Sequence, residues 1–337
     1  MFHTALIDSG GAVCRFEPRK EFRVFPNLHG HVWTLRAGLP ALSRVREPSR
    51  PEIFTTTVKD DRFGAVRLHG LYQESAGADE LLLIVHGLGA DATSSYCLNA
   101  ARVAQSTGIS SLRISMRGAD LSGEDIYHAG LSSDLADVLR SPRLDLYRKI
   151  YILGYSMGGH LALRAALDLV DSRLRAVAAV CPPLDLEATM NVSDAPSRRL
   201  YRYAICSALN RCYAMVERRG RACVPLEVVK RAKRCSEWNA LAIVPRFGFS
   251  SVEEYYRKAS VAGWLYRLET PSLLIACEQD PIVPKETVES ATEDASPALT
   301  VRWSARGGHV RMPQHLDLGF PGPLGLEQQI IAWLRWH

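Results

Sequence analysis

Short apolar runs, each bounded by turn residues, alternate along most of this chain with segments of helical period, and no other feature constrains the fold as strongly. Several of the runs are apolar throughout, as strands buried on both faces of a sheet are. The alternation is typical of a mostly parallel sheet covered by helices. Strands are expected at residues 81–87, 111–118, 149–156, 174–181, 271–277 and 299–305.

Two stretches interrupt this alternation and indicate how the chain is divided. An Arg-rich segment with helical stretches lies between the fourth and fifth expected strands, where an insertion would cover the strand ends that carry the ligand site of an open α/β sheet. We therefore predict an N-terminal extension (1–50), an α/β core (51–186 and 266–337) and a cap insertion (187–265). An antiparallel ribbon is expected at 53–72, and helices at 134–140, 158–169, 285–291 and 327–336.

The third expected strand leads into a helix through Gly154-Tyr155-Ser156-Met157-Gly158, a Gly-x-Ser-x-Gly pattern. The pattern alone also arises by chance, but between a strand and a helix it is typical of a nucleophile elbow, a sharp turn that exposes a serine hydroxyl. The helix N-terminus points free N–H groups at the place where an oxyanion would form. Ser156 is thus the candidate nucleophile, and the backbone N–H of Met157 is a candidate oxyanion donor.

A second oxyanion donor is expected from the loop after an earlier strand. The run at 81–87 continues into that loop, and the backbone N–H of Leu88 is the candidate, with Gly87 and Gly89 allowing close backbone approach. His86 is expected to be structural. A base at this position would precede the serine, whereas the expected chain order is serine, acid, histidine.

The residues after Ser156 supply the other two members of a catalytic triad. Asp280 follows the run at 271–277, and Glu278, two residues closer to that strand, is the alternative acid. His309 follows the last strand, next to the glycines at 307 and 308. Because a serine hydroxyl is a poor nucleophile, His309 would take its proton, and Asp280 would fix the imidazole tautomer.

Positive charge is concentrated in the predicted cap. Residues 196–235 contain eleven Lys or Arg and two Glu, although the whole chain has a formal net charge of only +5. Two interpretations stay open: the cap contacts anionic membrane surfaces or acidic substrates, or its arginines are solvated or paired with acidic residues of the core. Nucleic-acid binding is not expected, because no recognition motif accompanies the charge.

The eight cysteines form no Cys-x-x-Cys pair, and several lie in apolar runs, which favours reduced thiols and the cytoplasm. Four of them (Cys206, Cys212, Cys223 and Cys235) bunch together at separations that match no common zinc motif, so we expect no metal. No secretory signal or membrane-spanning run is visible in the sequence.

The motifs of this chain resemble those of the YheT-type branch of the α/β hydrolases, a group related to plant embryogenesis-associated proteins and animal lipid hydrolases. The resemblance spans most of the chain and implies the α/β-hydrolase fold, a small-molecule ester substrate, a carboxylesterase or lipase-like activity, no cofactor, and the triad Ser156, Asp280 and His309. It rests on Phe25-Pro26-Asn27-Leu28 with His31 and Thr34, residues 86–90, Met116-Arg117-Gly118 with Ser122-Gly123, residues 127–130, 154–160 and 252–260, Asp280-Pro281-Ile282-Val283-Pro284, and residues 307–310.

This chain departs from the resemblance at two alanines. Where the group has a small polar residue after the Arg-Gly pair and a serine after Tyr-His, the chain has Ala119 and Ala129. These differences leave the chemistry unchanged and concern the substrate. Three rival functions stay open at this point: acyl transfer or amide cleavage by the same triad, and a non-catalytic binding member of the fold.

Overall fold

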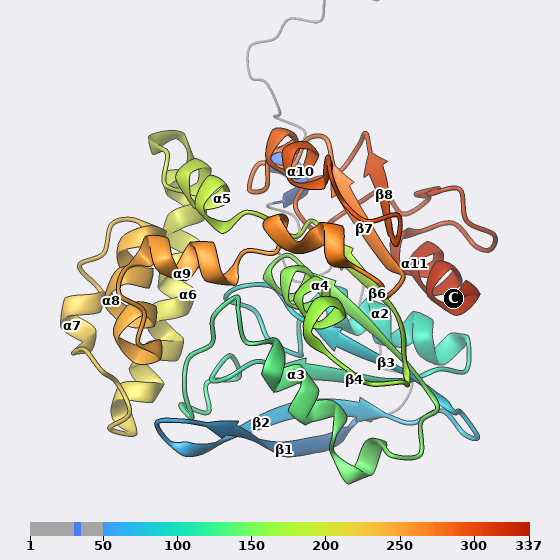
Figure 1. Cartoon of the computed structure of the whole chain (residues 1–337), viewed down its shortest axis with the longest axis horizontal. Helices are drawn as coiled ribbons and strands as arrows, with labels where there is room; N and C mark the ends of the chain where they lie inside the picture. Colours follow the sequence, from blue (N-terminus) through green and yellow to red (C-terminus); the bar gives the residue numbers. More distant parts are fainter. Residues whose placement is uncertain (1–29, 35–49) are drawn as a thin grey trace, which may run out of the picture.

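The computed structural model describes residues 30–34 and 50–337, and its centre is an eight-stranded sheet with the strand order β1-β2-β4-β3-β5-β6-β7-β8 (Figure 1). Strands β3 to β8 run parallel, while β1 and β2 form the antiparallel ribbon expected near residues 53–72. The α/β fold with a mostly parallel sheet is confirmed. The strands are β1 (Glu52–Asp60), β2 (Gly64–Gln73), β3 (Glu80–Val85), β4 (Ser110–Ser115), β5 (Lys149–Tyr155), β6 (Leu174–Val180), β7 (Ser272–Cys277) and β8 (Leu299–Ser304).

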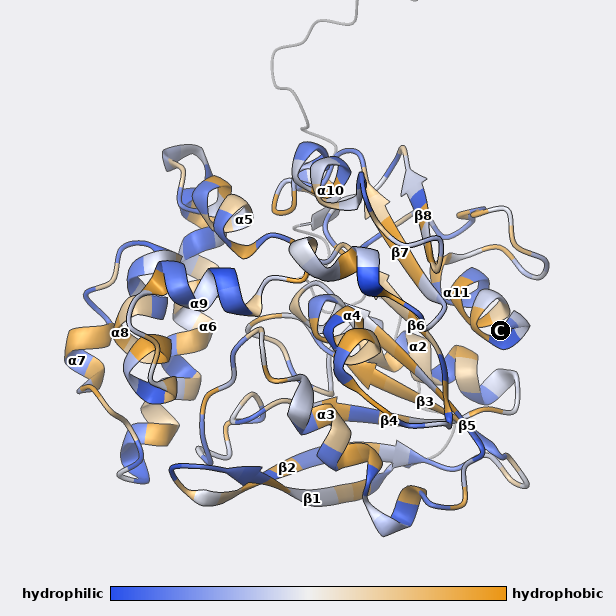
Figure 2. Ribbon diagram, in the orientation of Figure 1, coloured by the Kyte–Doolittle hydropathy of each residue, from blue (hydrophilic) through white to orange (hydrophobic). Residues whose placement is uncertain are grey.

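Helices cover both faces of the sheet, which explains why β3, near its centre, is apolar at five consecutive positions (Figure 2). In β3, Leu81, Leu83 and Val85 belong to one buried core, and Leu82 and Ile84 belong to the other. Helices α3 (Ser132–Leu139), α4 (Met157–Asp168) and α10 (Lys285–Thr292) contribute to the first core, and α2 (Ser95–Ser106) and α11 (Leu326–Trp336) to the second.

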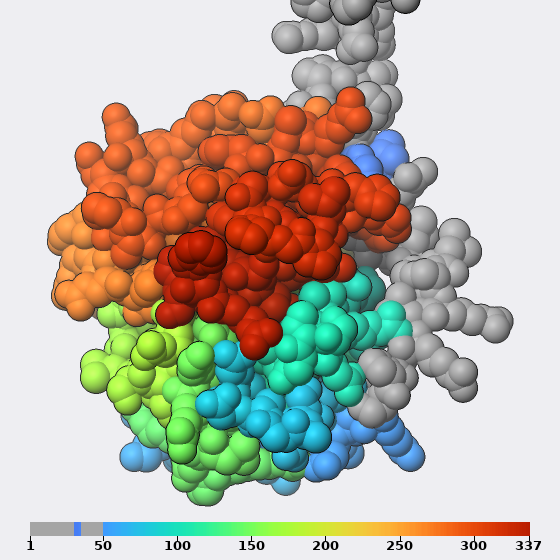
Figure 3. Space-filling view, turned by 90° about the vertical axis from the view of Figure 1, so that its right-hand side faces the viewer, coloured from blue at the N-terminus to red at the C-terminus, as the bar shows by residue number. Residues whose placement is uncertain are grey.

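Helix α2 is the one helix of the core layers that the apolar pattern did not predict. Its buried face consists mainly of small residues, including Cys97, Ala100 and Ala104, so few large apolar side chains mark it in the sequence. The helix lies beside α11 at the C-terminal end of the chain (Figure 3), where the Asn99 amide donates a 2.7 Å hydrogen bond to Glu327.

The long segment between β6 and β7 is helical, in the stretch for which a cap insertion is predicted (Figure 1). The exact division into domains stays a prediction, and most of the predicted extension at 1–50 lies outside the described residues. In the part of the chain that the structure describes, no helix is long and apolar enough to cross a bilayer. The helices of the segment are α5 (Leu186–Ser193), α6 (Arg199–Arg218), α7 (Leu226–Val229), α8 (Cys235–Phe247) and α9 (Val252–Ala259).

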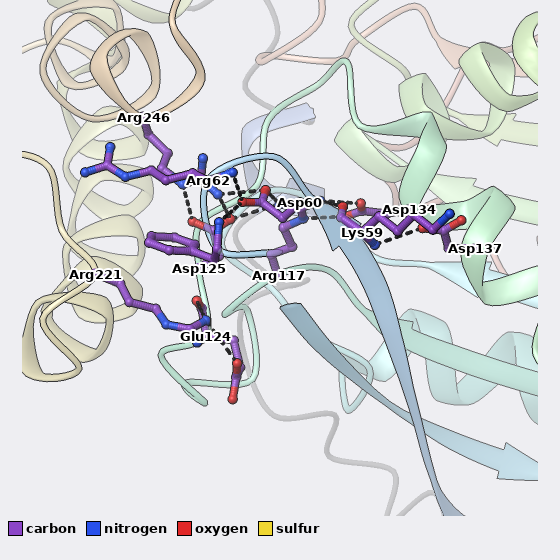
Figure 4. Close-up of polar contacts among 11 residues, drawn as sticks. Lys59, Asp60, Arg62, Arg117, Glu124, Asp125, Asp134, Asp137, Arg221 and Arg246 are labelled. Atoms are coloured by element: carbon purple, nitrogen blue, oxygen red, sulfur yellow. Dashed lines mark hydrogen bonds and ion pairs between the residues drawn. The ribbon is translucent and has the colours of Figure 1, made fainter. Parts of the chain in front are cut away.

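Buried charges join this helical cap to the core (Figure 4). The guanidinium of Arg117, which follows β4, contacts Asp60 at 2.5 Å, Asp125 at 2.9 Å and Asp134 at 2.7 Å. Arg246 of α8 contacts the same Asp60 and Asp125 at 2.8 and 2.6 Å. These five residues are called the charge cluster below. Because every charge in it has an opposite partner, the cluster fixes α8 against the core, and removing one partner would leave a buried charge poorly compensated.

Two of the basic cap residues are also paired with the core. Arg219 and Arg221 contact the buried Glu124 carboxylate at 3.0 and 3.2 Å, and Arg67 of β2 contacts it at 2.7 Å. Part of the positive charge of the cap therefore neutralises an acidic residue of the core, as one of the two interpretations of the sequence expects.

We expect the charge cluster to make the protein sensitive to acid. Burial opposes ionisation of Asp60, but hydrogen bonds from the backbone N–H of Phe63, from Arg117 and from Arg246 outweigh it and hold the pKa of Asp60 well below its ordinary value. A depressed carboxyl pKa stabilises the fold above the unfolded-state value near 3.8, and the contribution is lost as the pH falls below it. Asp60→Asn should lower the free energy of unfolding by about 2 kcal/mol at pH 7.

Urea denaturation of the native protein and of Asp60→Asn at pH 7, 5 and 3.5 tests this expectation. The difference in free energy of unfolding should shrink at the lowest pH, where the Asp60 carboxyl of the unfolded chain takes up protons while that of the folded protein stays ionised. A difference that stays constant or widens on acidification would contradict the assignment.

Candidate active site

Ser156 occupies a strained turn between β5 and α4. Its backbone has φ 52° and ψ −119°, a conformation that non-glycine residues rarely adopt and that costs about 1–3 kcal/mol. The glycines on either side make the turn possible, because a Cβ atom at Gly154 would overlap the backbone of Gly158, and one at Gly158 would overlap the backbone of Val85. The local sequence thus forms the elbow that its pattern predicts.

A continuous chain of hydrogen bonds connects the three predicted triad residues. His309 Nε2 lies 2.8 Å from Ser156 Oγ, and His309 Nδ1 lies 2.8 Å from Asp280 Oδ2. The other oxygen of Asp280 accepts hydrogen bonds from the backbone N–H groups of Ile282 and Val283. Asp280 and His309 are buried, while Ser156 is partly exposed. A ligand can therefore reach the serine hydroxyl, whereas the carboxylate and the imidazole are sheltered from solvent.

The structure separates the two candidate acids. Glu278 lies on the surface, where its carboxylate is 3.4 Å from Lys285 Nζ, and it is Asp280 that contacts the imidazole. The sequence could not distinguish them by position alone, since both follow β7.

The loop after β3 lies directly against the elbow. A Cβ atom added at Gly87 would lie 3.2 Å from the Ser156 Cβ, so the close approach depends on this glycine. Leu88, the next residue, and Met157, the first residue of α4, are thereby both placed beside Ser156. The Met157 N–H has no acceptor within its own helix, because the first N–H groups of a helix have none.

Comparison with known proteins identifies the family. A family model described as the alpha/beta hydrolase fold matches residues 80–314, which contain Ser156, Asp280 and His309. The chain belongs to this family. Two curated proteins are similar to it: "Putative esterase YheT" of Escherichia coli, 27% identical over 271 residues that cover 76% of each chain, and "Monoacylglycerol lipase" of Saccharomyces cerevisiae, 23% identical over 253 residues that cover 70% of this chain and 55% of the lipase.

These relatives support a hydrolase of the alpha/beta fold, and they confirm the resemblance to the YheT-type branch. The chain spans only about half the length of the yeast lipase. Among solved structures, the Pyrococcus furiosus esterase Pf2001 has a TM-score of 0.51 and 17% sequence identity, with 77% of this chain and 85% of the esterase covered. That likeness concerns the fold alone.

One contact of this alpha/beta hydrolase site was missed by sequence reasoning. Residues 30–34 form a helical turn, and the hydroxyl of Thr34 accepts a 2.8 Å hydrogen bond from the backbone N–H of His309. Gly308 permits this packing, because a Cβ atom there would lie 2.5 Å from both the Gly30 carbonyl oxygen and the Thr34 hydroxyl. In the sequence, this contact was indicated only by Thr34 being one of the residues that the chain shares with the YheT-type branch. The glycine lets the turn pack against the histidine loop.

The other histidines near the site have structural contacts. His86 is buried and accepts a 3.0 Å hydrogen bond from the Met116 backbone N–H, and the two ring nitrogens of His160 lie 2.6 and 2.9 Å from the carbonyl oxygens of Pro183 and Ala259. Burial lowers the pKa of both histidines. His128 is partly buried, and desolvation, with the nearby positive charges of Arg117 and Arg246, lowers its pKa to about 3. The rings of His86 and His128 are therefore neutral at pH 7.

The sulfur atoms of the bunched cysteines do not form a group of metal ligands. The Sγ atoms of Cys206 and Cys235 lie 3.9 Å apart, without a third ligand atom beside them in the described ranges. Three potential ligand atoms do come together at Cys181, Asp280 and His309. Asp280 and His309 are already hydrogen-bonded to each other, and His309 is also bonded to Ser156. The geometry of this group is therefore that of a serine–histidine–acid chain.

Proposed function

We propose that this protein hydrolyses carboxylic esters through an acyl-enzyme intermediate, with Ser156 as nucleophile, His309 as general base and Asp280 as the acid that orients it. The observation that carries the proposal is the unbroken chain of hydrogen bonds from Asp280 to the Ser156 hydroxyl at a strand-to-helix elbow. The esterase and lipase names of the relatives support the ester class.

The proposed reaction proceeds in two halves. Ser156 Oγ attacks the ester carbonyl carbon while His309 Nε2 accepts the hydroxyl proton, and the imidazolium then gives that proton to the alcohol oxygen as the ester bond breaks. Water next attacks the acyl group on Ser156 with His309 again as base, and the carboxylic acid leaves as the serine hydroxyl is restored. In both halves the backbone N–H groups of Leu88 and Met157 are the proposed donors to the oxyanion.

Acylation can be observed directly. Mixing the protein with excess nitrophenyl acetate should release a rapid burst of nitrophenolate followed by slower turnover, because an acyl-enzyme accumulates when its hydrolysis is the slower step. Mass spectrometry of the quenched reaction should find an acetyl group on the peptide that contains Ser156.

Product analysis separates hydrolysis from the rival activities. With an added primary alcohol, free acetate should remain the main product, whereas a dominant new ester would indicate an acyltransferase. Faster turnover of a nitroanilide than of the matched ester would indicate an amidase. Failure of a fluorophosphonate to label Ser156 would favour a non-catalytic protein.

A further inference from the structure

An apolar cavity lies between the cap and the core, beside the two proposed oxyanion donors. Its inner part has a volume of about 30 Å³. Core residues Leu88 and Met157 line it, and so do Leu209 of α6 and Trp238 and Ile243 of α8. An acyl group carried on Ser156 would have its carbonyl oxygen at these donors, and the cavity that Leu88 and Met157 line is an apolar space next to that position.

A second cavity of about 10 Å³, called the outer part below, shares lining side chains with the inner part, and these shared side chains are called the constriction. Three side chains line both parts and therefore form the boundary between them: Tyr127, Leu209 and Trp238. The outer part is lined mainly by small and apolar residues, namely Gly89, Ala90, Ala119, Ile126 and Cys212.

The polar groups in the wall of the inner part have partners within the protein. The hydroxyl of Tyr255 accepts a hydrogen bond from the Ala129 backbone N–H, the Asn239 amide donates to the hydroxyl of Tyr256, and His128 Nδ1 accepts from the Gly130 N–H. A ligand that enters this part therefore meets an apolar surface. Ala129 lines the inner part and Ala119 the outer part, so both departures from the family pattern remove a polar side chain from the cavity.

The far end of the cavity is closed by the charge cluster. Arg117 lines the outer part, and its guanidinium is held by Asp60, Asp125 and Asp134 (Figure 4). Extending the cavity in this direction would break buried ion pairs, which is costly. Arg246 of the same cluster lies on α8 with Trp238, so the cluster also fixes the helix that supplies part of the constriction.

The size of the cavity limits the chain that fits. A cavity needs a volume of about 10–15 Å³, measured in this way, to hold one water molecule, so the two parts together have room for about three. In liquid water three molecules occupy about 90 Å³, because each takes up about 30 Å³. That bulk corresponds to an acyl group of about two to four carbons.

We propose that this cavity is the acyl-binding site, that it selects esters of short, unbranched acids of about two to four carbons, and that Leu209 at the constriction sets the upper limit. This inference rests on the proposed esterase function and names the substrate class for it. Leu209 acts as a specificity-determining residue, since it lies at the boundary of the two parts and belongs to a cap helix.

Nitrophenyl esters from acetate to palmitate test the proposal on the native protein. We expect kcat/KM to be highest for acetate, propionate or butyrate and to fall at least tenfold between butyrate and octanoate, because the longer chain must displace packed side chains. A maximum at octanoate or longer would overturn the proposal.

Variants at Leu209 test the assigned residue. Leu209→Ala should raise the ratio of octanoate to butyrate turnover at least tenfold, and Leu209→Phe should lower butyrate turnover relative to acetate. Leu200→Ala is the matched control, since Leu200 lies on the same helix but is 74% exposed. If Leu209→Ala and Leu200→Ala gave the same chain-length profile, Leu209 would not set the limit. Thermal unfolding of each variant shows that it is folded before the profiles are compared.

A binding measurement separates this inference from the proposed chemistry. In Ser156→Ala, which cannot form an acyl-enzyme, ethyl butyrate should raise the melting temperature and ethyl octanoate at the same concentration should not. If the native protein hydrolysed no ester but this difference held, the proposed function would fail and the cavity assignment would stand. Equal stabilisation by both esters would overturn the cavity assignment.

Discussion

Ser156→Ala is expected to lower kcat for a small ester by a factor of at least about 10⁴, because the substitution removes the atom that carries the acyl group. The residual rate would come from the oxyanion donors and from substrate binding alone. The fold should be retained, since the side chain loses a single oxygen at a partly exposed turn. Steady-state hydrolysis of nitrophenyl acetate, with thermal unfolding of the same preparation, measures both effects.

Ser172→Ala provides the matched control for this experiment. Ser172 is exposed in the turn before β6, away from the hydrogen-bonded chain, so the same substitution there should leave turnover within about twofold of the native rate. Retention of more than about a tenth of the native activity by Ser156→Ala would show that another residue is the nucleophile.

The apolar pattern predicted the sheet well because its central strands are buried on both faces. Every residue of β3 and β7 is buried, and each of these strands appears in the sequence as a bounded, mainly apolar run. The elbow was equally predictable. The turn at Ser156 requires glycine at two fixed positions for steric reasons, and that requirement is visible as Gly154 and Gly158 in the sequence.

Features that depend on contacts distant in the chain were not predictable in this way. Helix α2 packs small residues, so few large apolar side chains mark it in the sequence, and the contact of Thr34 with His309 joins positions 275 residues apart. The pairing of Arg219 and Arg221 with Glu124 likewise depends on how the cap folds back on the core. Contact of the remaining basic cap residues with anionic membranes stays a prediction, as does the cytoplasmic location.

Asp280→Asn is expected to lower kcat by a factor of about 10⁴. One oxygen of Asp280 is held by the backbone N–H groups of Ile282 and Val283, so an asparagine would keep its oxygen there and turn its NH₂ group towards His309 Nδ1. The imidazole would then carry its proton on Nε2. In that tautomer Nε2 cannot accept the Ser156 proton, and the nucleophile is not activated.

Glu278→Gln is the control that makes the Asp280 measurement decisive. Glu278 is exposed, and in the described part of the chain it forms an ion pair with Lys285, so its substitution should change kcat by less than about twofold. Both variants should keep KM close to the native value, since neither carboxylate lines the apolar cavity. If Glu278→Gln abolished turnover while Asp280→Asn was mild, Glu278 would be the acid of the triad, and the hydrogen bond between Asp280 and His309 would have only a structural role.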